Sequence, residues 1–269
     1  MHRAYFFCLL LSFATSSFAE TVNFRIINTN ASSADEAKIR DGIEFFKSIY
    51  NQHCGAEISG QITHQRVNPP AGFSFVNDSS WTLAQVGANA SYWFRFFQKS
   101  MFDFNQTHRL SQRKNEVTIY LQQNLGSHCG FAFPDIQFTD AQARVKNPNA
   151  GINNSVVPWI RNRVIMAAPT QNGSDCANSN RMTAHELAHI FVQDESPHTC
   201  WDTELRRYQT CPEDNILATY RYVYDEPRFG RGRPPGPDLD EPQVRPATGT
   251  RLDQNQCQAI FNTIQNMNN

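Results

Sequence analysis

The chain has 269 residues, with 24 Lys and Arg against 25 Asp and Glu, so its formal net charge is −1. This balance gives no electrostatic reason to expect a nucleic acid or an anionic membrane as a partner. The length is sufficient for one large domain with its own core, and we expect residues 20–269 to form a single, monomeric domain.

The N-terminal segment has the pattern of a secretory leader. Arg3 precedes an apolar run over residues 4–13, and small residues follow up to Ala19. Such a run is too short to span a bilayer, and no later stretch approaches the length of a membrane helix. We therefore expect residues 1–19 to be a signal peptide and the mature protein to be secreted, either extracellular or periplasmic.

The cysteine count also fits an exported protein. One of the seven cysteines, Cys8, lies in the leader, and six remain. An even number in an exported chain predicts disulfides, and the chain has no Cys-x-x-Cys pair that would favour thiolate ligation of zinc. Cys200 and Cys211 are expected to pair because they are close in sequence. The six are Cys54, Cys129, Cys176, Cys200, Cys211 and Cys257.

The first part of the mature chain alternates strand and helix patterns. Apolar residues at every second position predict a strand over 22–26. Ser33 and Glu36 match the pattern of a capping box, which predicts that a helix begins there and continues to Gly55. A second strand is predicted over 58–62. The apolar face of the helix comprises Ile39, Ile43, Phe46 and Tyr50.

Further strands are predicted in the middle of the chain. The aromatic-rich stretch 81–101 lacks period-2 alternation and is expected to be a helix whose aromatic residues pack in the core. Alternating apolar residues predict a strand over 117–121. The stretch His128–Pro134 is short, bears a glycine and ends in proline, as is typical of an edge strand. A strand-like run follows over 163–168.

These elements predict an α+β fold, resembling an α/β sandwich, with a twisted mixed sheet and an edge strand over the cleft. A helix over 183–191 should carry the active site. Six prolines predict a surface loop over about 225–250. A final helix over about 251–267 should belong to a small C-terminal subdomain, with Phe261 on its apolar face.

The predicted helix over 183–191 contains the pattern His-Glu-x-x-His. His185 and His189 are four residues apart, so they share one face of the helix and can bind one metal ion. Zinc is the metal that this pattern usually binds. Glu186 lies about 100° around the helix from His185, beside the metal, where it can accept a proton from an activated water. The pattern therefore indicates a hydrolase.

A catalytic zinc site needs a third protein ligand. The candidates after the helix are Asp194, Glu195, His198 and Glu204. We rank His198 first because it is the first imidazole after the helix and follows Ser196–Pro197, where proline should turn the chain back.

The pattern from His185 to Leu217 resembles the metzincin clan of zinc endopeptidases. It combines the His-Glu-x-x-His helix, a third His, a cysteine-rich loop and the segment Cys211–Leu217. In that clan a turn bearing methionine runs beneath the zinc, and Asn215–Ile216–Leu217 takes its place here. The resemblance implies that an edge strand pairs with an extended peptide substrate. In this chain that strand would comprise Cys129, Gly130, Phe131 and Ala132.

The chain departs from the usual metzincin spacing. Val192 and Glu195 occupy the positions of the expected glycine and third ligand, and Leu217 replaces the turn methionine. A gluzincin arrangement, with Glu204 as the third ligand, is therefore also open.

The resulting hypothesis is a secreted zinc-dependent endopeptidase that acts on a peptide or protein substrate. A zinc-activated water attacks the scissile bond, Glu186 deprotonates that water and then protonates the leaving amine, and Tyr220 helps to hold the oxyanion. The alternative is a secreted zinc-stabilised binding or toxin-like protein without proteolytic activity. In that case Glu195 or Asp194 would join the three histidines in a closed site.

Overall fold

The computed structural model describes residues 19–69, 73, 75, 101, 103–111, 113, 115–123, 125, 129–134, 161–169, 179–193, 199–202, 207–218, 220–223, 243–246 and 248–269. The predicted leader, up to residue 18, and the greater part of the aromatic stretch 81–101 lie outside these residues. None of the described helices is both long and apolar enough to cross a membrane.

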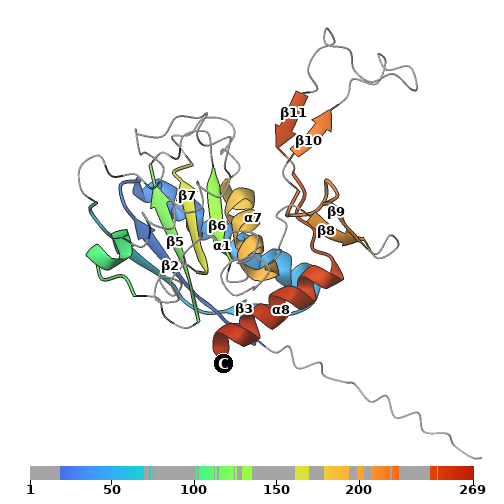
Figure 1. Cartoon of the computed structure of the whole chain (residues 1–269), viewed down its shortest axis with the longest axis horizontal. Coiled ribbons are helices and arrows are strands. Elements are labelled where there is room, and N and C mark those ends of the chain that lie inside the picture. The colour runs from blue at the N-terminus through green and yellow to red at the C-terminus, as the bar shows by residue number, and fades with distance from the viewer. Residues whose placement is uncertain are drawn as a thin grey trace, which may run out of the picture.

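A five-stranded mixed sheet forms the centre of the fold (Figure 1). Four of its strands are parallel, and the fifth, at the edge, runs antiparallel to its neighbour. This arrangement confirms the α+β prediction, including an edge strand within His128–Pro134. In sheet order the strands are β4 (Ile62–Arg66), β2 (Asn23–Asn28), β5 (Glu116–Gln122), β7 (Arg163–Ala167) and β6 (Gly130–Phe133).

The central strands are buried on both faces because each face of the sheet has its own core. In β7, Val164 and Met166 pack in the core beneath the helices, whereas Ile165 and Ala167 pack in the core on the opposite face. Every residue of β7 is buried, as is usual for a central parallel strand covered on both sides.

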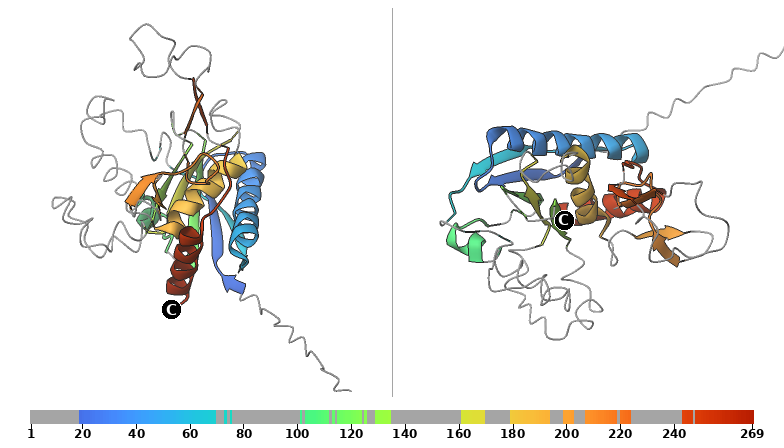
Figure 2. Two further views of the ribbon diagram at one scale, coloured as in Figure 1. Left: turned by 90° about the vertical axis from the view of Figure 1, so that its right-hand side faces the viewer. Right: turned by 90° about the horizontal axis from the view of Figure 1, so that it is seen from above.

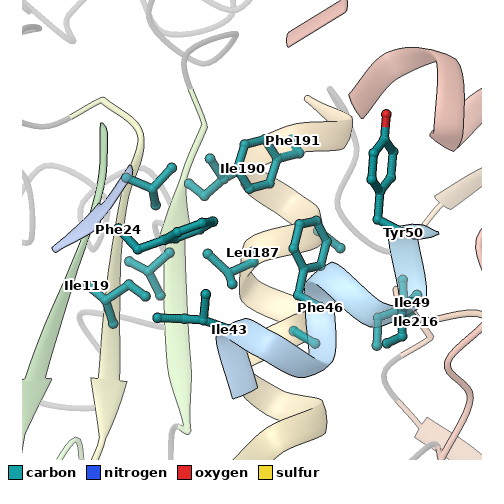
Figure 3. Packing of buried hydrophobic residues seen from close by; sticks show 14 of the residues in the cluster. Phe24, Ile43, Phe46, Ile49, Tyr50, Ile119, Leu187, Ile190, Phe191 and Ile216 are labelled. Atoms are coloured by element: carbon teal, nitrogen blue, oxygen red, sulfur yellow. The ribbon is translucent and has the colours of Figure 1, made fainter. Parts of the chain in front are cut away.

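Two helices, α1 (Ser33–Cys54) and α7 (Ser179–Val192), pack on one face of the sheet (Figure 2). The Phe46 ring of α1 stacks on the Phe191 ring of α7, with centroids 5.3 Å apart, and the Phe24 ring of β2 meets Phe191 edge-on. Figure 3 shows Leu187 and Ile43 among these rings. This packing fixes α7, which carries the His-Glu-x-x-His pattern, against the sheet.

The capping box of α1 lies one residue earlier than the sequence predicts. The Ser32 hydroxyl accepts from the Asp35 N–H, and the Asp35 carboxylate accepts from the Ser32 N–H, so Ser33 and Glu36 are not the box. The Glu36 carboxylate instead accepts a hydrogen bond from Asn28. The C-terminus is as predicted, since Gly55 has a φ of 68° and caps the helix.

The predicted second strand over 58–62 is in fact two strands. β3 (Glu57–Ser59) pairs with β1 (Ala19–Thr21), whereas β4 pairs with β2. Gly60 separates them, with a φ of 125° and its Cα so close to Val22 that a Cβ would lie 2.0 Å from the Val22 carbonyl oxygen. Only glycine can make this bend, which moves the chain from one sheet to the other.

The C-terminal part contains two small antiparallel ribbons and a final helix (Figure 1). The prediction of a loop over 225–250 is wrong at β11, because Pro246 ends a strand of a two-stranded ribbon, a position that proline tolerates. Helix α8 (Gln254–Asn268) is confirmed, although Phe261 is 38% exposed rather than part of the buried face. The ribbons pair β8 (Thr199–Asp202) with β9 (Arg207–Thr210), and β10 (Tyr220–Val223) with β11 (Gln243–Pro246).

Two disulfides fix this part of the chain. Cys200 and Cys211 are bonded, as predicted, and Cys54 at the end of α1 is bonded to Cys257 in α8. Cys129 is disulfide-bonded as well, to a partner outside the described residues. All five described cysteines are therefore oxidised.

We predict that the chain without its predicted leader contains no free thiol, because Cys176 is the only other cysteine after residue 19 and an even set can pair completely. Thiol titration under denaturing conditions should detect none, and a peptide map should recover the Cys54–Cys257 and Cys200–Cys211 links. Two or more free thiols per chain would contradict this disulfide framework.

Candidate metal centre and general base

Helix α7 brings the two histidines of the motif together. His185 is buried and His189 is half-buried, and their Nε2 atoms lie 3.1 Å apart. Two imidazoles that bind one tetrahedral zinc at the usual Zn–N distance have their nitrogens about 3.3 Å apart. The observed separation therefore fits a shared metal ion, and neutral imidazole is a ligand that zinc prefers.

The tautomer of His185 follows from its other ring nitrogen. Nδ1 lies 2.7 Å from the main-chain carbonyl oxygen of Ile216. A carbonyl oxygen can only accept, so Nδ1 carries the proton and donates it. Nε2 of the neutral ring then presents its lone pair toward His189. This is the usual arrangement of a metal-binding histidine, whose second nitrogen donates to an oxygen.

Arg181 fixes the turn that carries the Ile216 carbonyl. It lies one helical turn before His185 in α7 and is buried. Its Nη2 donates to the carbonyl oxygens of Ile216, at 3.2 Å, and Ala218, at 2.8 Å, and its Nε donates to that of Gly249. Burial lowers the pKa of Arg181 to about 10, so it remains a cation at neutral pH. Sequence reasoning did not identify Arg181.

Glu186 is buried beside the edge strand. Its side chain is so close to Gly130 of β6 that a Cβ at Gly130 would lie 2.7 Å from Glu186 Cγ and 2.9 Å from Met166 Sδ. Burial raises the pKa of Glu186 to about 8. The carboxyl group is therefore a stronger base than an ordinary glutamate, as a group that exchanges protons near neutral pH requires.

Strand β6 places the other predicted substrate-binding residues at the sheet edge. Phe131 pairs with Ile165 and Ala132 with Val164, both in β7, and both β6 residues are half-buried. In the sheet order β6 is the last strand, next to β7. The geometry thus brings Gly130 to Glu186 and leaves β6 as the outermost strand of this sheet.

The candidates for the third ligand lie outside the described residues. These candidates are Asp194, Glu195, His198 and Glu204. Within the described part of the chain, no group of three His, Cys, Asp or Glu residues could hold a metal ion. Tyr220 belongs to β10, but the position of its side chain is also outside what the structure describes.

Gly130→Ala is predicted to lower kcat of any peptidase activity by about a hundredfold, since an error of about 1 Å in a reacting group can have that effect. The added methyl group must displace the Glu186 side chain. Steady-state kinetics measure the loss. The control Gly55→Ala adds the same methyl group at the C-terminus of α1, at a φ of 68°, where the new Cβ meets nothing within 4 Å. Equal kcat values for Gly130→Ala and the wild type would contradict this prediction.

The raised pKa of Glu186 predicts a pH-dependent stability of the metal-free protein. Between the ordinary pKa of 4.5 and the folded value of about 8, the folded state holds a proton that the unfolded state releases. Stability therefore falls as pH rises through this range, by at most roughly 5 kcal/mol. Denaturation of chelator-treated protein should show this slope in the wild type and a flatter one in Glu186→Gln. Equal slopes would contradict it.

No protein-family model matches the chain, and the comparison with curated proteins found no match. Among solved structures, the chain aligns with the crystal structure of metalloproteinase-II from Bacteroides fragilis, with a TM-score of 0.43 and 10% sequence identity. The alignment covers 93% of this chain and 55% of that one, so this chain spans about half the length of that protein.

Proposed function

We propose that the chain is a secreted zinc-dependent endopeptidase with Glu186 as its general base. One observation supports this most strongly: the Nε2 atoms of His185 and His189 are 3.1 Å apart, and the next residue after His185 is a buried carboxyl group. Two converging imidazoles provide a metal site, and a carboxyl group beside it provides a base. The disulfides are compatible with export.

His185, His189 and a third ligand, which we propose to be His198, would hold the zinc. When bound, the metal would lower the pKa of a water molecule and polarise the scissile carbonyl. Glu186 accepts the proton of the attacking water, and the new C–O bond forms as the carbonyl π bond opens. Glu186 then returns the proton to the amine nitrogen as the C–N bond breaks, which completes hydrolysis.

The edge strand β6 would bind the substrate. An extended peptide that adds to a sheet edge makes main-chain hydrogen bonds, so its alignment does not depend on particular side chains. Gly130 lies against Glu186, and a peptide bound along Gly130–Phe131–Ala132 would therefore pass the general base. The His-Glu-x-x-His helix and the Cys211–Leu217 turn also support our proposal that the protein is metzincin-like.

A peptide library tests this function. The protein, refilled with zinc after chelation, should cleave peptides at internal bonds, and mass spectrometry of the products identifies the cut sites. The chelated sample should not cleave, and zinc should restore activity. If the zinc-loaded protein cleaves nothing across a broad library, a zinc-stabilised binding protein becomes the better explanation.

A further inference from the structure

The first turn of helix α8 contacts the turn that holds His185. Gln256 of α8 is 4% exposed, although its side chain is polar. Its Oε1 accepts from Asn215 Nδ2 at 2.8 Å, and its Nε2 donates to Asn215 Oδ1 at 3.2 Å. The two amide side chains are thus joined by two hydrogen bonds in the interior, which fix the orientation of both.

Asn215 connects Gln256 to His185, the proposed metal ligand, through the turn at Ile216. Its Oδ1 also accepts from the Leu217 N–H at 2.9 Å, which sets the conformation of the turn at Ile216. The Ile216 N–H donates to the Arg251 carbonyl, just before α8, and the Ile216 carbonyl accepts from His185 Nδ1. The Ile216 N–H is therefore held by Arg251, just before α8, and the Leu217 N–H by Asn215, which is itself paired with Gln256 of α8. The Ile216 carbonyl in turn fixes the rotation of the His185 imidazole.

Gln256 lies next to one cysteine of each of the two described disulfides. Cys257, the next residue, is bonded to Cys54 of α1, and Gln256 Nε2 lies 3.4 Å from the Sγ atom of Cys200, which is bonded to Cys211. The start of α8 is thus anchored to α1 and to the segment that enters the turn. Such anchoring makes Gln256 a fixed support rather than a mobile surface side chain.

We propose that Gln256 is a positioning residue of the metal centre, acting on His185 through Asn215 and the Ile216 carbonyl. The C-terminal helix is then part of the metal-binding apparatus, although it supplies no ligand. The proposal rests on the proposed function only in that His185 binds a metal ion. Its structural part, the orientation of the His185 ring, concerns the metal-free protein as well.

The experiment compares Gln256→Ala with Asp253→Ala. Both remove one half of the capping box of α8, because Asp253 Oδ1 accepts from the Gln256 N–H and Gln256 Oε1 accepts from the Asp253 N–H. Only Gln256→Ala removes the contact with Asn215. If Gln256 only stabilises the helix, the two variants should change zinc affinity and the exchange of the His185 ring proton equally. If Gln256 positions His185, only Gln256→Ala should change them.

Zinc affinity, measured by competition with a chelator, should fall about tenfold in Gln256→Ala, at the lower end of losses for groups that orient a ligand. In Asp253→Ala it should stay within about twofold of the wild type. The second readout is the ring Nδ1–H proton of His185 in metal-free protein, observed by NMR. It should be protected from exchange in the wild type and in Asp253→Ala, and exposed in Gln256→Ala.

Equal zinc affinities in the two variants, or an unchanged His185 ring proton in Gln256→Ala, would overturn the proposal. If the wild type binds no zinc, the proposed function fails, and the ring proton still decides the role of Gln256. Should Gln256→Ala not fold, Gln256→Glu serves instead. It keeps the oxygen that caps α8 but loses the N–H donor to Asn215 Oδ1, and it should expose the same ring proton.

Discussion

Replacing Glu186 with glutamine is expected to lower the rate of peptide hydrolysis by about a hundredfold to ten-thousandfold. Glutamine has nearly the same shape, but its amide cannot accept the proton of the attacking water. Because Glu186 is not a ligand in the proposed mechanism, zinc content should be unchanged and the thermal stability of the zinc-bound protein should barely change. Kinetics on a peptide that the wild type cleaves, with zinc content and melting temperature, measure all three quantities.

The matched control is Glu57→Gln, which makes the same chemical change at an exposed position in β3. It should leave the rate of cleavage unaltered. Cleavage by Glu186→Gln at the wild-type rate would exclude a general base at this position. A loss of zinc in Glu186→Gln would instead indicate that the carboxylate binds the metal.

Replacing His198 with alanine is expected to remove most of the bound zinc, and with it the activity. A catalytic zinc site has three protein ligands, and His198, the first imidazole after the helix in the sequence, is the most suitable third one. Glu195→Gln, three residues earlier, is the control and should retain zinc. Zinc content by mass spectrometry distinguishes them. Retention in His198→Ala together with loss in Glu195→Gln would show that Glu195 is the ligand.

The elements that sequence predicts well are those with a strong local signal. Helix α1 has a regular apolar face and ends at Gly55, and α7 places His185 and His189 on one face as their spacing requires. Strand β6 is at the sheet edge, as the sequence from His128 to Pro134 indicates. Each of these predictions depends on periodicity or on a residue with a specific backbone preference, and both are local properties.

The errors arise where tertiary contacts decide between local alternatives. Ser32 and Ser33 are both acceptable N-caps, and each has an acidic residue three positions later, so the sequence cannot distinguish the two boxes. The break at Gly60 depends on contact with Val22, which the sequence does not reveal. Strand β11 forms because it pairs with β10, despite its terminal proline.

The contacts that orient the side chains of the candidate site could not be predicted from the sequence either. The oxygen that orients His185 is the Ile216 main-chain carbonyl, and a carbonyl is present at every residue. Arg181 could have been noticed, because it lies one helical turn before His185 on the same face. Its partners, however, are carbonyl groups more than thirty residues away in sequence. The contact between Gly130 and Glu186 likewise appears only when β6 and α7 pack together.

The central claim is that His185 and His189 share a metal ion. Native mass spectrometry of the protein, first treated with a chelator and then dialysed against limiting zinc, measures it most directly. We predict one tightly bound zinc per chain, lost on chelation and regained on dialysis. A wild-type chain that folds but retains no zinc after this treatment would contradict it.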